Sequence, residues 1–402
     1  MDVTLSDITA AAQRIRPEVC VTPCPHSIAL SRATQCEVYC KLDHLQRTGS
    51  FKERGARNAL LLLTSDQKKR GVIAASAGNH AQALAYHAGL LGIPVTVVMP
   101  VHAPLMKVNN CRQLGAMILQ HGKTIADAAQ LAHQHVAERG LTYINGFDDA
   151  PIIAGQGTMG LEILEQVPDC DAIIVPIGGG GLIAGIAIAV KAMKPSVQII
   201  GVEPENAASF TAAMREGAPV RIDTRPTLAD GLAVPRVGDR ALKLALPLID
   251  QVVTVSERAI ATAILRLVEL EKSVVEGAGA AGLAALVEGK LPELRGKRVV
   301  LPLCGGNIDT PVLGRIIDRG LVADGRLCRL ETTISDRPGG LAKFTQLIAD
   351  AGASVRDILH DRAFAGDDVH QVLVRCLIET RDAAHVQTLR DRLESEGYAL
   401  SG

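Results

Sequence analysis

The sequence has 402 residues, 48% of them hydrophobic, which is enough for a substantial core and for two or three domains of about 100–200 residues each. Its 42 Lys and Arg nearly balance 43 Asp and Glu, so the formal net charge of -1 creates no long-range attraction to nucleic acid or anionic lipid. Four Tyr, five Phe and no Trp leave little aromatic surface for stacking bases. We therefore expect no nucleic-acid partner and no membrane partner.

The cysteines and the N-terminus indicate a reducing compartment. The nine cysteines are an odd number spread from Cys20 to Cys376, unlike the dense disulfide framework of a small secreted domain. The first residues include Asp2 and Asp7 and lack an apolar core segment, which argues against a signal or transit peptide. We therefore expect a cytoplasmic location.

Strands and helices are predicted to alternate along most of the chain. A strand, a polar turn and a helix are expected within 71–93, further strands at 94–100, 116–122, 197–204 and 299–306, and another helix at 123–140. Such alternation is typical of a mostly parallel, doubly wound α/β sheet with helices on both faces, in which ligands bind at the carboxyl ends of the strands. No repeat or low-complexity tract in the sequence indicates a solenoid.

The stretch from Ala172 to Val190 is nearly long enough to span a membrane, because its 19 residues carry no charge. However, Pro176 and the following glycines would break a membrane helix at its centre, where unpaired backbone groups are costly. We therefore predict a buried strand at 172–177, a glycine loop, and a helix that begins near Leu182.

A separate C-terminal module is predicted after the short polar connector 318–326, with the boundary at Asp324 and Gly325. The pattern beyond it predicts a strand at 328–334, a helix at 336–352, strands at 353–363 and 369–379, a helix around Val386, Leu389 and Leu393, and a fourth strand at 398–400. This βαββαβ order is typical of a small α+β domain of the ferredoxin-like type.

Two segments of the N-terminal half carry polar residues that could contact a ligand. Lys52 stands in SFKERGA, directly after the strand-like segment 37–45, although an isolated lysine is more often a surface residue. SAGNH at 76–80 falls at a strand-to-helix turn, where free backbone N–H groups can bind an anion, although an ordinary helix N-cap would look the same. His80 is assigned no acid–base role, since a packed or capping histidine fits the same pattern.

The four glycines from Gly178 to Gly181 give the strongest local signal. They follow a buried strand and precede a helix, and an ordinary turn would rarely use four residues that lose so much entropy on folding. We predict that their backbone closely approaches a phosphate group. The segment lacks the Lys-Ser/Thr pair of a P-loop, and a dinucleotide-binding fold is the weaker alternative. CGGNI at 304–308 places another glycine pair after a strand end, with Cys304 as either a small buried residue or part of a site.

Five potential zinc ligands lie close together near the N-terminus: Cys20, Cys24, His26, Cys36 and Cys40. Their C-x3-C spacing differs from the shorter C-x2-C spacing of most zinc sites, and Cys36 and Cys40 share a parity on a strand, as core residues do. We therefore predict no metal site.

Together, SFKERGA, SAGNH, AGQGT at 154–158, GGGG and CGGNI, in this order and spacing, resemble the serine/threonine dehydratase family of pyridoxal-phosphate enzymes with the tryptophan-synthase-β fold. The resemblance covers residues from about 5 to about 320. It implies a two-subdomain, doubly wound fold over residues 1–324, known as PLP fold type II, with a mobile small subdomain at about 71–147. Residues 325–402 resemble a single ACT regulatory domain, because DRPGGL at 336–341 is similar to its strand-to-helix turn. The implied reaction is β-elimination of L-threonine to 2-oxobutanoate and ammonia, and of L-serine to pyruvate.

The resemblance also assigns roles to individual residues. Lys52 would hold pyridoxal 5'-phosphate as a Schiff base, which requires a partly neutral amine in a desolvated site, and would then act as the base at the substrate Cα. Cys304 would face the pyridine nitrogen, where a neutral partner suits β-elimination. The other implied cofactor-binding residues are Phe51 beside the ring, Asn79 at the 3′ oxygen, and Gly178, Gly179, Gly180, Gly181 and Leu182 around the phosphate. The implied substrate-binding residues are Ser76, Ala77, Gly78, Asn79 and His80.

Two positions depart from the patterns of the family. Racemases of this family carry a serine where this chain has Ala77, so the resemblance implies little racemisation. Relatives with a divalent-cation site have Glu, a backbone carbonyl and Asp where this chain has Glu203, Ala207 and Ser209. Loss of the second carboxylate disfavours magnesium and leaves a more weakly bound or a monovalent ion as the alternative.

Three classes of function are compatible with the residues: a pyridoxal-phosphate lyase, a dinucleotide-dependent oxidoreductase, and a catalytically silent amino-acid sensor. Within the lyase class, the alternatives are a 3-hydroxyaspartate lyase and a serine racemase, and Phe147, next to Asp148 and Asp149, is a candidate for lining the substrate pocket. The resemblance further implies an amino-acid effector at the C-terminal domain and a homodimer or homotetramer. It does not distinguish isoleucine biosynthesis from threonine breakdown.

Overall fold

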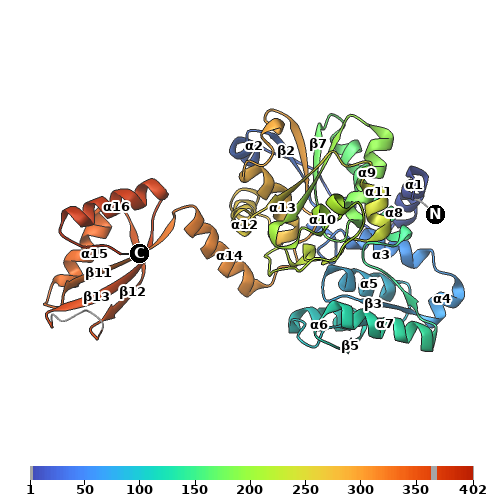
Figure 1. Ribbon diagram of the computed structural model, residues 1–402, viewed down its shortest axis with the longest axis horizontal. Helices are drawn as coiled ribbons and strands as arrows, with labels where there is room; N and C mark the ends of the chain where they lie inside the picture. The colour runs from blue at the N-terminus through green and yellow to red at the C-terminus, as the bar shows by residue number, and fades with distance from the viewer. Residues whose placement is uncertain (1–2, 364–368, 402) are drawn as a thin grey trace. The chain divides into compact units, whose positions relative to one another are not determined.

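The computed structural model describes residues 3–363 and 369–401, and the chain forms two compact units, Met1–Asp309 and Thr310–Gly402 (Figure 1). Asp2, one of the two acidic residues considered at the N-terminus, lies outside the described residues. The division between the units falls before the predicted boundary at Asp324 and Gly325, because helix α14 (Thr310–Ala323) groups with the C-terminal unit. The extent of the regulatory domain stays a prediction.

The larger sheet of the first unit has six strands in the order β1-β2-β10-β7-β8-β9, and all neighbours are parallel except β1 and β2. These strands are β1 (His26–Ser27), β2 (Glu37–Lys41), β7 (Ala172–Pro176), β8 (Gln198–Pro204), β9 (Gln251–Val255) and β10 (Arg298–Pro302). Every residue of β7 is buried, which explains its uniformly apolar sequence, because a parallel strand between two helical layers has no exposed face.

Helices cover both faces of this sheet (Figure 1). The helices on one side are α8 (Ala150–Gln166), α9 (Gly181–Met193) and α11 (Asp239–Ala245), and those on the other are α2 (Ile28–Thr34), α12 (Glu257–Glu271) and α13 (Gly277–Val287). Helices α1 (Leu5–Ile15) and α10 (Ser209–Glu216) complete this part. The core between the layers includes Ile173, Val175, Ile183 and Phe210, all fully or almost fully buried.

The smaller sheet of the first unit has four parallel strands in the order β5-β4-β3-β6. They are β3 (Val72–Ala75), β4 (Val95–Met99), β5 (Met117–Gln120) and β6 (Thr142–Tyr143), and the accompanying helices are α4 (Ser65–Arg70), α5 (Asn79–Leu90), α6 (Leu105–Gln113) and α7 (Ile125–Arg139). These strands lie within the segment 71–147 that was expected to form the small subdomain. The mobility of that subdomain stays a prediction.

Helix α3 (Lys52–Leu61) packs against both α5 and α8 and thereby joins the two sheets. Its Arg54 is fully buried and pairs with Asp43 (Nε to Oδ2, 2.6 Å) and with Glu162 (Nη1 to Oε1, 2.6 Å). Glu162 also contacts Nζ of the buried Lys41 at 2.5 Å. Since each buried charge has an opposite partner, this network fixes the start of α3, where Lys52 stands.

The second unit contains a three-stranded antiparallel sheet in the order β11-β13-β12. Its elements are β11 (Leu327–Ser335), α15 (Gly340–Asp350), β12 (Ser354–Asp361), β13 (Gln371–Glu379) and α16 (Ala383–Ser395). Phe344, Ile348, Leu389 and Leu393 are buried between the helices and the sheet. This order of strands and helices confirms the expected α+β fold.

The fourth strand predicted at 398–400 is the exception, and this prediction is wrong. Residues 398–400 form no strand, and the chain pairs only at the next residue, Ser401, whose backbone exchanges two hydrogen bonds of 2.8 and 2.9 Å with that of Glu331. Gly397 (φ 89°) turns the chain after α16, and the Tyr398 ring then packs on Phe344 with 5.2 Å between ring centroids. Core packing of Tyr398 therefore replaces strand pairing at this point.

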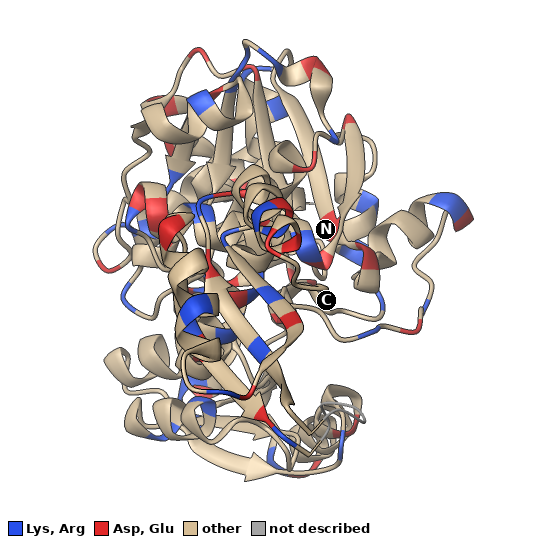
Figure 2. Ribbon diagram, turned by 90° about the vertical axis from the view of Figure 1, so that its left-hand side faces the viewer, with Lys and Arg blue, Asp and Glu red and all other residues tan. Residues whose placement is uncertain are grey.

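The other predicted elements of the first unit are confirmed, including the strand and helix on either side of the glycine loop, which are β7 and α9. Within the described ranges, no helix is long and apolar enough to cross a membrane. Basic and acidic residues are interspersed along the ribbon (Figure 2), in line with the nearly balanced composition.

Candidate active site

Lys52 is the first residue of α3, and its amine is held inside the first unit. Nζ donates a hydrogen bond of 2.6 Å to the carbonyl oxygen of Gly146 and lies 5.0 Å from the centre of the Phe51 ring. Burial lowers the pKa of the amine to about 8, against the opposing influence of Cys304 and Glu276. Lys52 is therefore not an ordinary surface lysine, since a sizeable fraction of its amine is neutral at moderately alkaline pH.

The segment before Lys52 is tied to the segment that follows strand β10. The Phe51 amide donates to the Cys304 carbonyl at 3.0 Å, and Ser50 forms an antiparallel bridge with Gly305. Strands β2 and β10 are parallel neighbours, so their carboxyl ends meet at the same edge of the sheet. The motifs SFKERGA and CGGNI are thus brought together, as the sequence predicts.

The SAGNH turn connects β3 to α5 at the same site. The Gly78 amide donates to Ser76 Oγ at 3.3 Å, so the serine hydroxyl hydrogen stays available for a ligand. The Asn79 side chain has two partners: Nδ2 donates to Glu276 Oε1 at 2.6 Å, and Oδ1 accepts from Asn307 Nδ2 at 2.8 Å. Asn79 therefore lies beside the CGGNI segment, which contains Asn307.

His80 is buried at the start of α5, with its Nε2 3.0 Å from the Ile144 carbonyl oxygen. Burial, and then the nearby Lys52, lower its pKa to about 4, so the ring is neutral at physiological pH. A Cβ at Gly146 would lie 3.1 Å from His80 Cγ, so the ring supports the segment whose carbonyl holds Lys52. The absence of an acid–base role for His80 stays a prediction.

The glycine loop follows β7 and opens α9, whose N-cap Gly180 adopts a φ of 92° that favours glycine. Among the described residues, the amides of Gly178, Gly179 and Gly180 donate no hydrogen bond, and Gly181 and Leu182 form the first turn of the helix. Unpaired amides at a helix N-terminus are suited to bind the oxygens of a phosphate.

Phe147 lies directly against this loop. A Cβ at Gly179 would come within 2.2 Å of the Phe147 ring, and one at Gly181 within 2.2 Å of its carbonyl oxygen. Larger residues are therefore excluded from these two positions. The loop is thus close to Gly146, the neighbour of Phe147, and so to the amine of Lys52.

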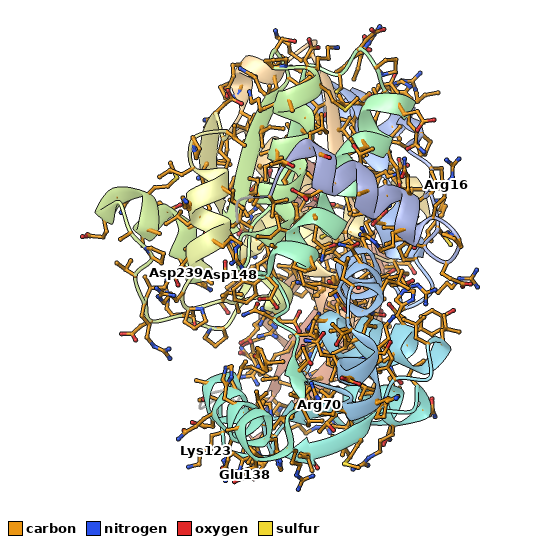
Figure 3. The ribbon with its side chains drawn as sticks, turned by 90° about the vertical axis from the view of Figure 1, so that its right-hand side faces the viewer. Arg16, Arg70, Lys123, Glu138, Asp148 and Asp239 are labelled. Atoms are coloured by element: carbon orange, nitrogen blue, oxygen red, sulfur yellow. The ribbon has the colours of Figure 1, made fainter. Side chains whose placement is uncertain are left out.

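The carboxylates next to Phe147 are already engaged. The Asp148 side chain lies beside the first turn of helix α11, which begins at Asp239 (Figure 3). Oδ1 of Asp148 accepts a hydrogen bond of 2.8 Å from the Ala241 amide of that turn. Asp149 Oδ2 accepts from the Asn145 amide at 2.9 Å. Both residues therefore fix the local backbone.

Cys304 is buried, with 2% of its surface exposed. Burial raises the pKa of its thiol well above the ordinary value, and the charge of Glu276 adds to this effect. The group is therefore a neutral thiol. An amine with a lowered pKa, an uncharged thiol and a cradle of unpaired amides together fit a cofactor that carries an aldehyde, a pyridine ring and a phosphate.

The AGQGT motif does not lie at the carboxyl ends of the strands, where the other motifs meet, but inside helix α8. A Cβ at Gly155 would come within 2.6 Å of the Gly55 Cα, and one at Gly157 within 2.8 Å of the Gly185 carbonyl oxygen. These glycines therefore allow α8 to pack closely on α3 and α9. The motif therefore contributes to helix packing rather than to the site directly.

Neither candidate metal site gathers ligands. The nine cysteines are free, and the described residues contain no group of His, Cys, Asp or Glu suited to a metal ion. Glu203 is buried and caps α10, since its two carboxylate oxygens accept from the amides of Phe210 and Thr211 at 2.7 and 2.8 Å. That carboxylate is therefore occupied by the protein itself.

Sequence reasoning missed Glu276, Asn307 and Gly146, which contact the predicted residues directly. The only sign in the sequence that Glu276 is buried is its position immediately before the apolar run GAGAAG of α13. Gly146 contributes through its carbonyl oxygen, a group that residue type does not reveal.

Residues 15–305 match the family described as pyridoxal-phosphate dependent enzyme, and residues 329–394 match the ACT domain. The first match covers more than half of the chain, so the chain belongs to the family of pyridoxal-phosphate-dependent enzymes and uses this cofactor. It is 43% identical over 398 residues to the L-threonine ammonia-lyase of Thermotoga maritima, with 99% of each chain covered.

Two solved structures support the same fold. Threonine deaminase isoform 2 from Solanum lycopersicum, in its processed form, has a TM-score of 0.74 and 36% identity, and the match covers 78% of this chain and 92% of that one. Maize serine racemase has a TM-score of 0.75 and 34% identity, with 80% of this chain and 99% of that chain covered. The predicted fold class and cofactor are thus confirmed, and the dinucleotide-dependent alternative is excluded.

Proposed function

We propose that this chain catalyses the β-elimination of L-threonine, which yields 2-oxobutanoate and ammonia, and that it also converts L-serine to pyruvate. The observation that carries the proposal is the buried amine of Lys52, which has a lowered pKa and donates a hydrogen bond to the Gly146 carbonyl oxygen. The choice of threonine is supported by the full-length similarity to the L-threonine ammonia-lyase of Thermotoga maritima.

Lys52 has two tasks in this proposal: it is the covalent anchor and then the base that takes the proton from the substrate Cα. A neutral amine is required for both, and burial provides it by lowering the pKa to about 8. The Gly146 carbonyl accepts from Nζ and so directs the amine. Bound pyridoxal phosphate supplies the electron sink for the charge that develops at Cα.

The remaining residues bind and orient. The Ser76 hydroxyl and the neighbouring amides of the SAGNH turn receive the substrate carboxylate, and the amides from Gly178 to Leu182 receive the cofactor phosphate. Cys304 stays protonated because burial raises its pKa, so it offers no negative charge to the pyridine nitrogen. A weakly protonated ring suits elimination.

The second unit is proposed to bind an amino-acid effector, with the match of residues 329–394 to the ACT domain as support. We further propose a homodimer or homotetramer, since a small sheet of this kind can bury its exposed edge against another copy. A cytoplasmic location is supported by nine free cysteines, which suit a reducing compartment.

The proposal is tested by incubating purified, cofactor-loaded protein with L-threonine, L-serine and 3-hydroxyaspartate and measuring keto acid and ammonia. We expect 2-oxobutanoate from threonine and pyruvate from serine. A protein that contains the cofactor but releases no keto acid from threonine or serine would be a silent sensor or a lyase for another amino acid. Faster turnover of 3-hydroxyaspartate than of threonine would favour the hydroxyaspartate lyase.

A further inference from the structure

The orientation of the Asn79 carboxamide follows from a chain of hydrogen bonds that ends at a backbone oxygen. Asn307 Nδ2 lies 2.7 Å from the Thr48 carbonyl oxygen, which can only accept, so the group of Asn307 at this position is its NH2. The same Nδ2 donates to Asn79 at 2.8 Å, and the facing atom of Asn79 is therefore Oδ1. The Asn79 NH2 must then face Glu276, 2.6 Å away.

The Glu276 carboxylate occupies space that is open only because residue 305 is a glycine. It is the N-cap residue of α13, only 6% exposed, and its amide donates to the Gly305 carbonyl at 2.9 Å. A Cβ at Gly305 would come within 2.2 Å of Glu276 Oε1. The glycine after Cys304 is thus explained by the carboxylate that rests against it.

One hydrogen of the Asn79 NH2 is used by Glu276, and within the part of the chain that the structure describes the other has no acceptor. If Asn79 were flipped, it would present an oxygen to the carboxylate and to the oxygen of a bound cofactor, and both contacts would be repulsive. An acceptor at position 276 therefore selects the orientation that a cofactor oxygen requires.

We propose that Glu276 is a positioning residue that fixes the Asn79 carboxamide so that its second N–H donates to the ring oxygen of pyridoxal phosphate. This inference rests on the proposed function, because it gives Asn79 its partner in the cofactor. Glu276 acts through Asn79 and does not itself touch the cofactor.

Titration of Glu276 gives the proposal a pH signature. Burial, and then Asp230, raise the pKa of Glu276 to about 7, while Asn79 and Lys107 oppose the shift. Four titratable groups influence it or feel its charge: Asp230 of the turn Asp230–Leu232, Lys107 of α6, Lys52 of α3, and Cys304 after β10. Protonation below pH 7 replaces a charged acceptor by a neutral one, so cofactor affinity should fall on that side.

The test is a double-mutant cycle on cofactor affinity. The dissociation constant of pyridoxal phosphate is measured by titrating apoprotein at pH 8 for the wild type, Glu276→Ala, Asn79→Ala and the double variant, with thermal unfolding of each apoprotein as the folding control. We expect Glu276→Ala to weaken binding about tenfold in the wild-type background and less than about twofold in the Asn79→Ala background, because residues in one network are not additive. Glu288→Gln, at the other end of α13, is the matched control and should leave the constant unchanged.

Two further variants make the result decisive. Glu276→Gln keeps an acceptor and should bind the cofactor within about threefold of the wild type at pH 8. Its fall in affinity between pH 8 and pH 6 should be smaller than that of the wild type, because only the titration of Lys52 then contributes to it. Glu276→Asp withdraws the acceptor but keeps the charge, and it replaces Glu276→Ala in the cycle if the alanine variant does not fold. Equal penalties in both Asn79 backgrounds, or an unchanged pH dependence in Glu276→Gln, would overturn the inference. A wild-type protein that binds pyridoxal phosphate but does not deaminate threonine would instead contradict the proposed function.

Discussion

The amine of Lys52 and the carbonyl oxygen of Gly146 are joined by a hydrogen bond of 2.6 Å. Gly146 follows strand β6 of the smaller sheet, whereas Lys52 begins the helix that packs between the two sheets. The two parts of the first unit therefore meet at the amine that carries the chemistry in the proposed function. A shift of the smaller sheet would move the acceptor away from the amine.

Lys52→Ala should abolish threonine deamination, by at least about a thousandfold, because one side chain supplies both the covalent anchor and the base. The visible absorption band of the bound cofactor should disappear, while the thermal unfolding midpoint stays within a few degrees. Lys69→Ala, which changes an exposed lysine of α4, is the control and should be fully active. Full deamination by Lys52→Ala would contradict the assignment of Lys52 as anchor and base.

Cofactor capture by the apoprotein should accelerate as the pH rises from 7 to 9. Only the neutral amine reacts with an aldehyde, and burial lowers the pKa of Lys52 to about 8, so the reactive fraction grows through this window. The pKa of the neighbouring His80 is about 4, so its ring does not titrate there. Stopped-flow absorbance measures the rate. A flat profile between pH 7 and 9 would contradict the lowered pKa.

Sequence patterns predicted the elements that depend on local composition. The apolar strand β7, the glycine loop and α9 follow from an uncharged stretch interrupted by Pro176 and four glycines, and the parallel sheet then brings the loop ends to one edge. The family resemblance, and not this pattern alone, assigns Lys52, Asn79 and Cys304 to one site, and each of them follows a strand or begins the next helix.

Contacts between distant segments were beyond sequence reasoning. The pairing of Asn79 with Glu276 joins residues 197 positions apart, and the Gly146 carbonyl acts through a group that all residues share. The same limit applies to AGQGT, where helix packing rather than a ligand explains the glycines. At the C-terminus, Tyr398 packs into the core, a tertiary effect that overrides the strand propensity of its segment.

Cys304→Ser should keep most of the activity, within about threefold, because a neutral hydroxyl can also pair with the pyridine nitrogen. Cys304→Asp should impair elimination by about tenfold or more, since a carboxylate would favour the protonated ring. Steady-state rates, normalised to cofactor content, measure both effects. Cys111→Ser, which makes the same change at another buried position, controls for the loss of a core thiol. Equal rates for the Asp and Ser variants would show this account of Cys304 to be wrong.

The enzyme should convert L-serine to pyruvate with negligible D-serine, because the Ala77 side chain has no proton to deliver to the far face of Cα. Chiral chromatography of the reaction mixture decides the matter. Ala77→Ser supplies the hydroxyl that racemases of the serine/threonine dehydratase family carry at this position, and D-serine should become detectable in this variant. Comparable yields of D-serine and pyruvate from the wild type would refute the prediction and favour a racemase.

Removal of the C-terminal module should leave an active lyase that no longer responds to amino acids. The first unit, Met1–Asp309, contains both sheets and every proposed site residue, and maize serine racemase is matched over 99% of its length by 80% of this chain. An effector such as isoleucine or valine can shift the catalytic unit only by its differential affinity for two states, typically about 1–3 kcal/mol.

The decisive comparison uses the intact chain and two truncated forms, one ending at Asp324, which keeps α14, and one ending at Asp309, which removes it. Threonine saturation curves are recorded with and without branched-chain amino acids, and cofactor content is measured for each form. We expect the intact enzyme to shift its curve and both truncated forms to bind the cofactor and turn over threonine without a shift. An intact enzyme indifferent to every candidate amino acid would instead make the module an assembly device, and its removal should then change the oligomeric state measured by light scattering.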